Sequence, residues 1–380
     1  MRRVLALGAG LLALHAPFAA NAADRSPKGR KPVAEAPATA RKVADVQTRK
    51  ATLPPRVNSQ PIRKQGGPKA ERAEKAAAPA RNGKSASAAT RAGRLVKASF
   101  AQRPVEPPRM SIGNAIGLHL VDDPLDLRSS VALVLDQETG DTLYQKNPDA
   151  VLPIASITKV MTSMVVLDAG LPLDEMIEVT EADRDTERHS SSRLAIGSKL
   201  ARAEMLHLAL MASENRAAHA LGRTFPGGLP AFIDAMNAKA RAIGMTDSRF
   251  ADPTGLSSNN VSNARDLARM VRVAHAYPLI REYSTATGLT VDTGYRQVAF
   301  RSTNRLVDHP DWQIGLQKTG YISEAGKCLV MQATVDGRQV ILVLLDAAGA
   351  QSRFADAQRL RKWISQQPRD SRLHAEARSS

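Results

Sequence analysis

The sequence predicts an α+β fold in which an antiparallel β-sheet is flanked by helices and the chain includes an all-helical subregion. Three observations predict it. Residues 131–146 hold two strand-like stretches around a turn, residues 153–277 carry helical patterns, and residues 289–346 return to strand-like stretches. Strands at both ends of a domain with helices between them favour one antiparallel sheet covered by helices.

The first elements are a hairpin and a very apolar helix. VALVLD (131–136) and TLYQK (142–146) flank the turn QETGD and alternate as strands of a hairpin do. PIASITKVMTSMVVLDAG (153–170) then predicts a helix that stops at Gly170. The helix is apolar on nearly every side, so it belongs inside a core, yet Lys159 lies in its first turn.

The middle of the domain shows further helical patterns, at residues 202–212, 215–225, 229–243 and 264–277. The first two are joined only by Ser213 and Glu214. The third ends at Gly244, and the fourth ends before Pro278.

The chain then returns to strands, predicted at residues 289–293, 296–303, 312–320, 327–335 and 338–346. VDGRQ (335–339) is typical of the turn in a hairpin. A final helix is predicted over residues 352–365. Cys328, the only cysteine, lies on an alternating strand, which favours a buried structural thiol over a catalytic one.

The charge is distributed very unevenly. A net charge of +16 would by itself suggest a nucleic-acid-binding protein. From Asp24 to Arg109, however, there are 21 Lys/Arg and 6 Asp/Glu, whereas the residues after Arg109 hold 30 Lys/Arg and 31 Asp/Glu. The folded part is therefore nearly neutral, and we expect no nucleic-acid partner.

The first 22 residues are expected to be a signal peptide. Arg2 and Arg3 precede an apolar stretch, and small residues end at Ala22. A membrane anchor is the alternative, but the stretch is short and is interrupted by His15 and Pro17. We therefore expect cleavage after Ala22, export across the inner membrane to the periplasm, and no transmembrane span in the mature protein.

The rest of the chain divides into a linker, one domain and a tail. Residues 23–110 are rich in Ala, Pro, Lys and Arg and predict a disordered basic linker. Residues 111–365 form the predicted domain, and residues 366–380 predict a second disordered tail. The linker charge suits electrostatic contact with anionic envelope polymers; an inert, solubilising spacer is the alternative.

Ser156 and Lys159 form the first candidate for chemistry. Residues three apart on a helix share one face, so the amine can reach the hydroxyl. Burial disfavours an ammonium and lowers the lysine pKa, and a neutral amine can take the serine proton. Spacing alone is a weak signal, because S-x-x-K is expected about once by chance in a chain this long. Its position at the head of an apolar helix is less ordinary.

The second candidate is K-T-G, Lys318 to Gly320, at the end of an apolar strand. A strand edge can pair with a substrate backbone, and glycine permits close approach. Lys318 supplies a positive charge and Thr319 a hydroxyl, both suited to a carboxylate. A solvated lysine before a turn is the alternative.

The third candidate, S-x-N, is ambiguous from spacing. It matches at Ser213–Asn215, Ser257–Asn259, Ser258–Asn260 and Ser302–Asn304. The context favours the first match, because a short turn between two helices can direct Ser213 and Asn215 into a cleft. Ser213 could then relay a proton to a leaving nitrogen, and Asn215 could hold a substrate carbonyl.

The order S-x-x-K, S-x-N, K-T-G is that of β-lactamases and penicillin-binding proteins. ASITKVMTSMVVLDAGLPLDE, LALMASENRAAHAL, DPTGLSSNNVSNARDLARM and LQKTGYISEAGKCLVM closely resemble D-alanyl-D-alanine endopeptidases of the penicillin-binding protein 7 type. The resemblance covers about residues 125–365. It implies a β-lactamase/transpeptidase-like fold, an antiparallel sheet flanked by an all-helical region, with the site at their junction.

The resemblance also implies roles for the motif residues. They are nucleophile Ser156, general base Lys159, proton shuttle Ser213, substrate-binding Asn215, carboxylate-binding Lys318 and Thr319, and an oxyanion hole from the backbone N–H groups of Ser156 and Tyr321. The implied activity is a serine-type DD-endopeptidase that cleaves peptidoglycan peptide cross-links and is acylated by β-lactams.

Other activities remain as alternatives. A D-alanyl-D-alanine carboxypeptidase shares the same chemistry. A serine β-lactamase is disfavoured because the E-x-x-L-N pattern is absent from the sequence, and a non-catalytic wall-binding protein is disfavoured by the three motifs. We expect no cofactor and no metal site. His189, His207, His219 and His275 are expected to be surface or packing residues, and Trp312 and Trp363 packing anchors.

Overall fold

The computed structural model describes residues 110–367. The predicted signal peptide and basic linker, apart from Met110, and the predicted tail from Pro368 onward lie outside the described residues. Within 110–367, no helix has both the length and the apolarity that a bilayer crossing requires.

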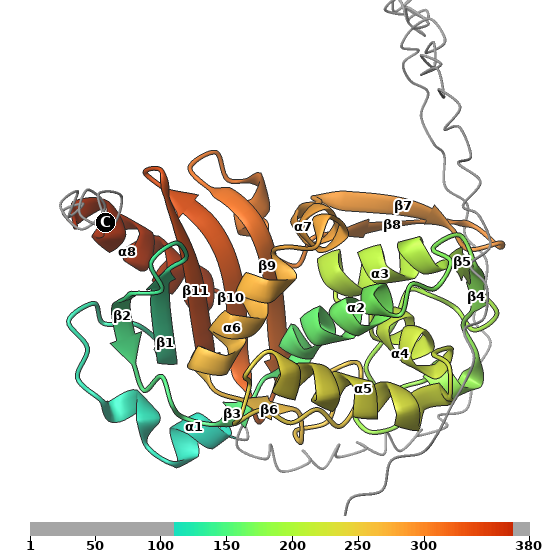
Figure 1. The fold of residues 1–380 in the computed structure, drawn as a ribbon, viewed down its shortest axis with the longest axis horizontal. Helices are drawn as coiled ribbons and strands as arrows, with labels where there is room; N and C mark the ends of the chain where they lie inside the picture. Colours follow the sequence, from blue (N-terminus) through green and yellow to red (C-terminus); the bar gives the residue numbers. More distant parts are fainter. Residues whose placement is uncertain (1–109, 368–380) are drawn as a thin grey trace, which may run out of the picture. The chain divides into compact units, whose positions relative to one another are not determined.

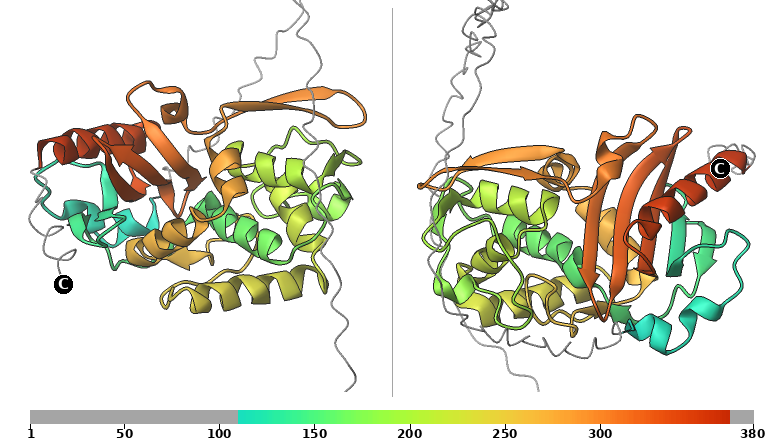
Figure 2. Two further views of the ribbon diagram at one scale, coloured as in Figure 1. Left: turned by 45° about the horizontal axis from the view of Figure 1, so that its top comes forward. Right: turned by 180° about the vertical axis from the view of Figure 1, so that it is seen from behind.

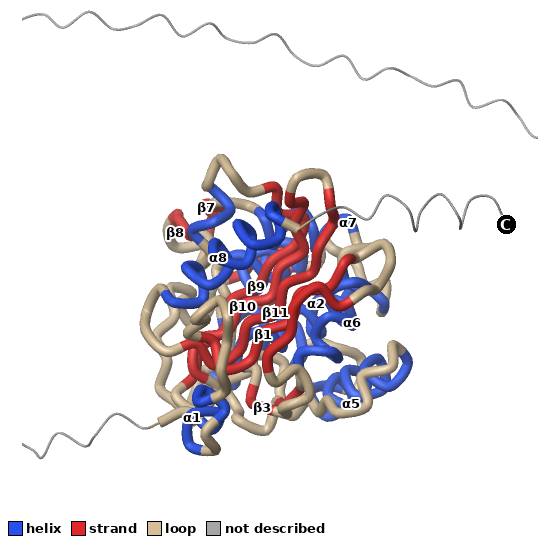
Figure 3. The backbone as a smooth tube through the Cα atoms, turned by 90° about the vertical axis from the view of Figure 1, so that its left-hand side faces the viewer, coloured by secondary structure: helices blue, strands red, loops and turns tan. Residues whose placement is uncertain are grey.

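An antiparallel sheet of five strands forms the first half of the fold (Figures 1 and 3). Its order is β2-β1-β11-β10-β9, and its strands are β1 (Ser129–Asp136), β2 (Thr142–Lys146), β9 (Gln313–Ile322), β10 (Gly326–Val335) and β11 (Arg338–Ala347). β10 and β11 form the predicted hairpin, with Asp336 and Gly337 at positive φ of 50° and 79°. β9 is an edge strand, so one side of its backbone is open to a further strand.

Both faces of the sheet are covered. Along β1, Val131 and Leu133 belong to one apolar core, whereas Ala132 and Val134 belong to another. Because strand side chains alternate in direction, the two cores lie on opposite faces. Helix α6 (Ala264–Ala274) contacts β1, β10 and β11, and α8 (Ser352–Gln366) contacts β10 and β11 from the other side (Figures 1 and 2).

The all-helical region surrounds α2 (Thr158–Asp168), whose residues are buried from Thr158 to Val166. α2 contacts helices from several parts of the chain, namely α3 (Arg202–Met211), α4 (Asn215–Arg223), α5 (Gly228–Ala242), α6 and α7 (Pro278–Thr285). The predicted burial of this helix is confirmed. It begins later than expected, because Ser156 lies in a 3₁₀ turn, Ala155–Ile157, that leads into it.

The structure corrects two expectations. β7 (Gly288–Asp292) and β8 (Gln297–Arg301) form a separate two-stranded sheet and do not join the main one. Helix α7 was not expected, because Pro278 was interpreted only as a stop signal. Proline also fits the first turn of a helix, and the same residue therefore separates α6 from α7 and begins the latter.

The remaining elements are short. They are α1 (Ile112–Ala115), the pair β3 (Leu152–Pro153) and β6 (Val261–Ser262), and the pair β4 (Met176–Glu178) and β5 (Lys199–Ala201). Cys328 is fully buried on β10, and burial raises the pKa of its thiol to about 12. This agrees with a structural thiol. Trp312 is buried, and Trp363 packs edge-on against Tyr144.

Candidate active site

Ser156 and Lys159 meet at the junction of the sheet and the helical region. The turn before α2 places Ala155 at a positive φ of 48°, and the chain then enters α2. Lys159 Nζ lies 2.8 Å from Ser156 Oγ. Ser156 lines a cavity of about 460 Å³, whereas the lysine stays behind it, fully buried. The geometry is that of a hydroxyl facing a cleft with an amine in reach of its proton.

Burial sets the electrostatics of Lys159. Removal from water lowers its pKa from the ordinary value of 10.5 to about 7, against the opposing attraction of Asp252 and Glu214. Its amine is also 2.8 Å from Asn215 Oδ1 and 2.6 Å from the Thr254 carbonyl oxygen. A pKa of about 7 leaves a large share of the amine unprotonated at neutral pH, as a general base requires.

Ser213 and Asn215 come from the turn between α3 and α4. Ser213 has a positive φ of 59°, and its Oγ accepts a hydrogen bond of 2.8 Å from Lys318 Nζ. Asn215 opens α4, contacts Lys159 through Oδ1, and donates from Nδ2 to Ser190 Oγ at 3.1 Å. Both side chains line the cavity. Of the four S-x-N matches, this is the one whose serine bonds to Lys318 and whose asparagine bonds to Lys159.

The K-T-G motif lies on the edge strand β9. Lys318 is fully buried, and burial followed by repulsion from Lys159 lowers its pKa well below the ordinary range. It therefore does not line the cavity, whereas Thr319, Gly320 and Tyr321 do. A Cβ on Gly320 would lie 2.9 Å from the Ile154 carbonyl oxygen. Glycine is thus what allows β9 to approach the nucleophile turn.

Residues outside the S-x-x-K, Ser213–Asn215 and K-T-G motifs complete the cavity. Thr303 Oγ1 lies 2.6 Å from Thr319 Oγ1. Arg353, from the first turn of α8, lines the cavity beside them, and its Nε and Nη1 are buried without a hydrogen-bond partner among residues 110–367. The charge of an arginine on the same cavity wall as a hydroxyl pair is suited to a carboxylate. Only the fold reveals it, because α8 is remote from β9 in sequence.

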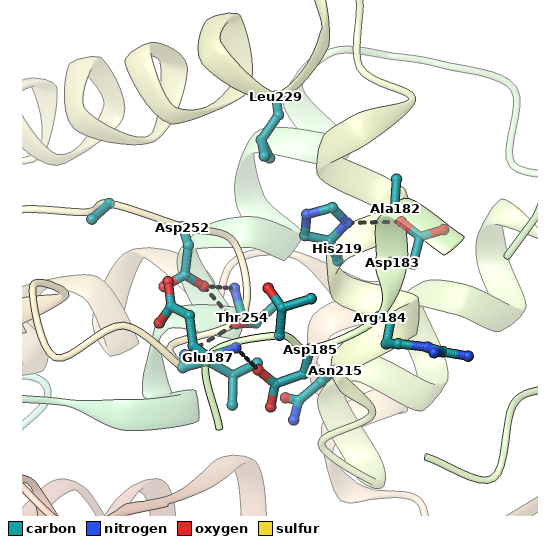
Figure 4. A pocket seen from close by; sticks show the side chains of 13 residues that line it. Ala182, Asp183, Arg184, Asp185, Glu187, Asn215, His219, Leu229, Asp252 and Thr254 are labelled. Carbon is teal, nitrogen blue, oxygen red and sulfur yellow. Dashed lines mark hydrogen bonds and ion pairs between the residues drawn. The ribbon is translucent and has the colours of Figure 1, made fainter. Parts of the chain in front are cut away.

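A second cavity of about 290 Å³ adjoins the first and shares Asn215 and Leu256 with it (Figure 4). Its wall holds Asp183, which is paired with His219 at 2.7 Å and with Arg223. Burial opposes ionisation there, but these hydrogen bonds lower the pKa of Asp183 to about 2. His219 therefore helps to hold a buried carboxylate of the cavity wall, in keeping with the expected packing role.

Within the described part of the chain, no three His, Cys, Asp or Glu side chains gather in a way that could hold an ion. Another carboxylate of this cavity organises a loop: Asp185 accepts from the backbone N–H groups of Glu187, Arg188 and Ser190.

Comparison with known proteins shows the family to which the chain belongs. The Peptidase S11 family, described as D-alanyl-D-alanine carboxypeptidase, matches residues 119–349. A D-alanyl-D-alanine endopeptidase of Pseudomonas aeruginosa is 51% identical over 241 residues, 63% of this chain and 78% of that protein. The protein of the same name from Escherichia coli is 47% identical over the same shares.

Solved structures agree with the fold. A DD-transpeptidase from Streptomyces strain K15 matches with a TM-score of 0.59 and 27% identity, over 64% of this chain and 98% of that one. Penicillin-binding protein D2 from Listeria monocytogenes, in a cefotaxime-bound form, matches with a TM-score of 0.57 and 30% identity, over 63% and 98%. The expected α+β, β-lactamase/transpeptidase-like fold is confirmed. The chain belongs to the Peptidase S11 family of D-alanyl-D-alanine carboxypeptidases and is a serine-type DD-peptidase.

Proposed function

We propose that this protein is a DD-endopeptidase that hydrolyses the peptide cross-links of peptidoglycan through an acyl-enzyme on Ser156. One observation carries the chemistry: the Ser156 hydroxyl lies 2.8 Å from a fully buried amine whose pKa is about 7. The choice of bond is supported by two relatives at 51% and 47% identity, both named D-alanyl-D-alanine endopeptidase.

In the proposed mechanism, Lys159 takes the Ser156 proton as Oγ attacks the D-alanine carbonyl carbon. The negative charge that forms on the carbonyl oxygen is held by the backbone N–H groups of Ser156 and Tyr321. Collapse of this intermediate breaks the C–N bond, and Ser213 relays a proton to the leaving nitrogen. Water then attacks the ester, which releases the peptide acid and restores the Ser156 hydroxyl.

Substrate binding is assigned to the residues around β9. Asn215 holds the amide carbonyl of the donor peptide, and the β9 edge at Gly320 and Tyr321 pairs with its backbone. Thr319 and Arg353 take the carboxylate next to the scissile bond, while Lys318 holds Ser213 and bonds to the Thr319 carbonyl oxygen. β-Lactams carry a carboxylate and an acyl carbon at similar positions, so they are expected to occupy the same site and acylate Ser156.

A D-alanyl-D-alanine carboxypeptidase is the second candidate. The description of the family favours it, and so does a Bacillus subtilis relative named as a carboxypeptidase. That relative is 30% identical, well below the two endopeptidases. The two activities differ in the leaving group, which is free D-alanine in one case and the side amine of a diamino acid in the other.

Purified cross-linked muropeptides test the assignment. The expected result is conversion of dimers to monomers, with no loss of terminal D-alanine from pentapeptide monomers. Ser156→Ala should abolish conversion, and penicillin should add its mass to the wild type but not to Ser156→Ala. Release of D-alanine with intact dimers would instead make the protein a carboxypeptidase. An unmodified wild type would contradict the acyl-enzyme.

We also propose that the protein is exported to the periplasm and that its basic segment contacts anionic envelope polymers. The support comes from the sequence: a signal-like beginning, and 21 Lys/Arg against 6 Asp/Glu between Asp24 and Arg109, beside a nearly neutral domain. Peptidoglycan carboxylates and phosphorylated surface polymers would be the partners, because attraction of this kind needs charge but no folded interface.

A further inference from the structure

Asp252 lies outside the three motifs, yet its carboxylate organises a whole loop. The Asp252 loop, residues 251–260, connects the region after α5 to β6. Asp252 Oδ1 accepts from the backbone N–H groups of Thr254 (2.6 Å) and Gly255 (2.8 Å) and from Thr254 Oγ1 (2.5 Å). Its Oδ2 accepts from Ser257 N (3.0 Å) and Asn260 Nδ2 (2.5 Å). Five donors on one carboxylate fix the loop in a single conformation.

This loop contacts α2 and the nucleophile turn directly. The Thr254 carbonyl oxygen is 2.6 Å from Lys159 Nζ, and the Pro253 carbonyl accepts from Thr162 Oγ1 at 2.7 Å. Gly255, at a φ of +80°, presses against the turn so closely that a Cβ would lie 2.0 Å from the Ala155 carbonyl oxygen. The position of the Asp252 loop therefore sets the position of the amine and of the backbone beside Ser156.

Asp252 also contributes charge. The charged groups that face Lys159 are Asp252 of the loop, Glu214 before α4 and Lys318 of β9, and the cavity in front adds Arg188 and Arg353. Asp252 is the largest of the contributions that raise the pKa of Lys159 against the effect of burial. Figure 4 shows Asp252 hydrogen-bonded to Thr254 on the wall of the second cavity.

We propose that Asp252 is a positioning residue for acyl transfer: through the Asp252 loop it holds the Thr254 carbonyl on Lys159 and Gly255 on the Ser156 turn, and its charge tunes the base. The inference rests on the proposed roles of Ser156 and Lys159. Asp252 contacts neither Ser156 nor the cavity that Ser156 lines, so it acts through its neighbours. A purely structural aspartate would affect folding stability without changing the pH at which the base works.

The test is the pH dependence of acylation by a fluorescent penicillin, measured for the full chain and for Asp252→Asn. In the wild type the rate should rise with pH through about 7, as Lys159 loses its proton. Asp252→Asn removes a negative charge, which lowers the lysine pKa further, so the rise should move to lower pH. The limiting rate should fall about tenfold or more, because the amine is no longer held in place.

Asp123→Asn is the matched control. Asp123 is also a buried, loop-building carboxylate, with the backbone N–H groups of Leu125 and Leu127 as donors, but it pairs with Lys146 and lines neither cavity. This variant should melt at a lower temperature and keep the wild-type pH of half-maximal acylation. An Asp252→Asn profile that superimposes on that of the wild type, or falls in rate with no shift in pH, would overturn the proposal.

If the Asp252→Asn protein does not fold, the Gly255→Ala variant tests the positioning role of the same loop. The added Cβ must push the loop off the Ala155 carbonyl while all charges stay in place, so acylation should slow about tenfold or more. Acylation at the wild-type rate would contradict the positioning role. A wild type that is not acylated at all would instead contradict the proposed function, and the two failures are thereby distinguished.

Discussion

A charged ammonium group is costly to bury in a protein core. Lys159 nevertheless lies in the core of this domain, with its whole side chain removed from water. The core accepts it because the amine keeps three polar neighbours, Ser156, Asn215 and the Thr254 carbonyl, and because its lowered pKa lets it lose its charge. The same desolvation that costs stability thus creates the base.

Replacing Lys159 by Arg tests whether the residue acts as a general base or only supplies a positive charge. A guanidinium stays protonated at all relevant pH values, so it cannot accept the serine proton. We expect acylation by penicillin to fall by about 100-fold or more between pH 6 and 9. Intact-mass spectrometry over time measures this, with circular dichroism as the control for folding. A folded Lys159→Arg protein that is acylated at a near-normal rate would refute the role of base.

Arg353 makes a different prediction, about the carboxylate of the substrate. Arg353 lines the cavity, and its buried Nε and Nη1 lack partners among the described residues. Hydrogen bonds to charged groups contribute about 1.5–3 kcal/mol, so Arg353→Gln should lower kcat/KM roughly tenfold to 100-fold. The effect should be seen with a peptide that bears the carboxylate.

The corresponding peptide amide is the control for Arg353→Gln. The amide already lacks the charge that the arginine would hold, so the variant and the wild type should cleave it at similar, low rates. Equal losses on the carboxylate and the amide would show that Arg353 supports the fold of the cavity and does not bind the carboxylate.

Individual site residues differed in how far they could be predicted from sequence. The S-x-x-K spacing at the head of an apolar helix, the short turn that holds Ser213 and Asn215, and the order of the motifs pointed to residues that the structure brings together. Arg353 and the Thr254 carbonyl could not be found in this way. The first comes from a remote helix, and the second is a backbone atom whose neighbours in sequence carry no catalytic signature.

Among the elements, the edge strand β9 contributes most to the site, since it forms one wall of the cavity and has a neighbouring strand in the sheet on one side only. Its contact with the nucleophile turn depends on Gly320. Gly320→Ala places a Cβ 2.9 Å from the Ile154 carbonyl oxygen and 3.2 Å from Ser156 N, so β9 must move away from the turn. Acylation should fall about tenfold or more, because the Tyr321 N–H then misses the developing oxyanion.

Gly315→Ala, on the same strand, is a useful comparison for Gly320→Ala. The Cβ there would meet the side chains of Gln332 and His275, away from the cavity. It should cost thermal stability with a smaller effect on acylation. If the two variants lose stability and acylation in the same proportion, the glycine at 320 serves the strand and not the oxyanion.

Element prediction failed where local sequence signals have two meanings. Alternation identified β7 and β8 as strands, but alternation does not specify which strand is the partner, and the two pair only with each other. Pro278 signalled the end of one helix and also began the next. By contrast, the helices with long apolar faces, and the β10–β11 hairpin with its Asp-Gly turn, followed directly from their patterns.

At the scale of the whole molecule, the feature that the catalytic domain does not explain is the charge of the preceding segment. Between Asp24 and Arg109 the excess of basic residues gives +15, whereas the residues after Arg109 carry a net −1. If this segment concentrates the enzyme on an anionic wall, its effect must be screened by salt, since the Debye length falls from about 10 Å at 0.1 M to about 3 Å at 1 M.

Deletion of residues 24–109, with residues 1–23 joined directly to Met110, separates wall affinity from catalysis. The active-site residues lie within 110–367, so acylation by penicillin and cleavage of small soluble muropeptides should be unchanged. Binding to whole sacculi should weaken, because the domain alone carries almost no net charge to attract an anionic polymer. Sedimentation with sacculi at low and high salt measures this, and the difference between the two proteins should vanish at high salt. Equal sedimentation at low salt would show that the segment is a spacer, and a loss of soluble activity would show that it also serves the catalytic domain.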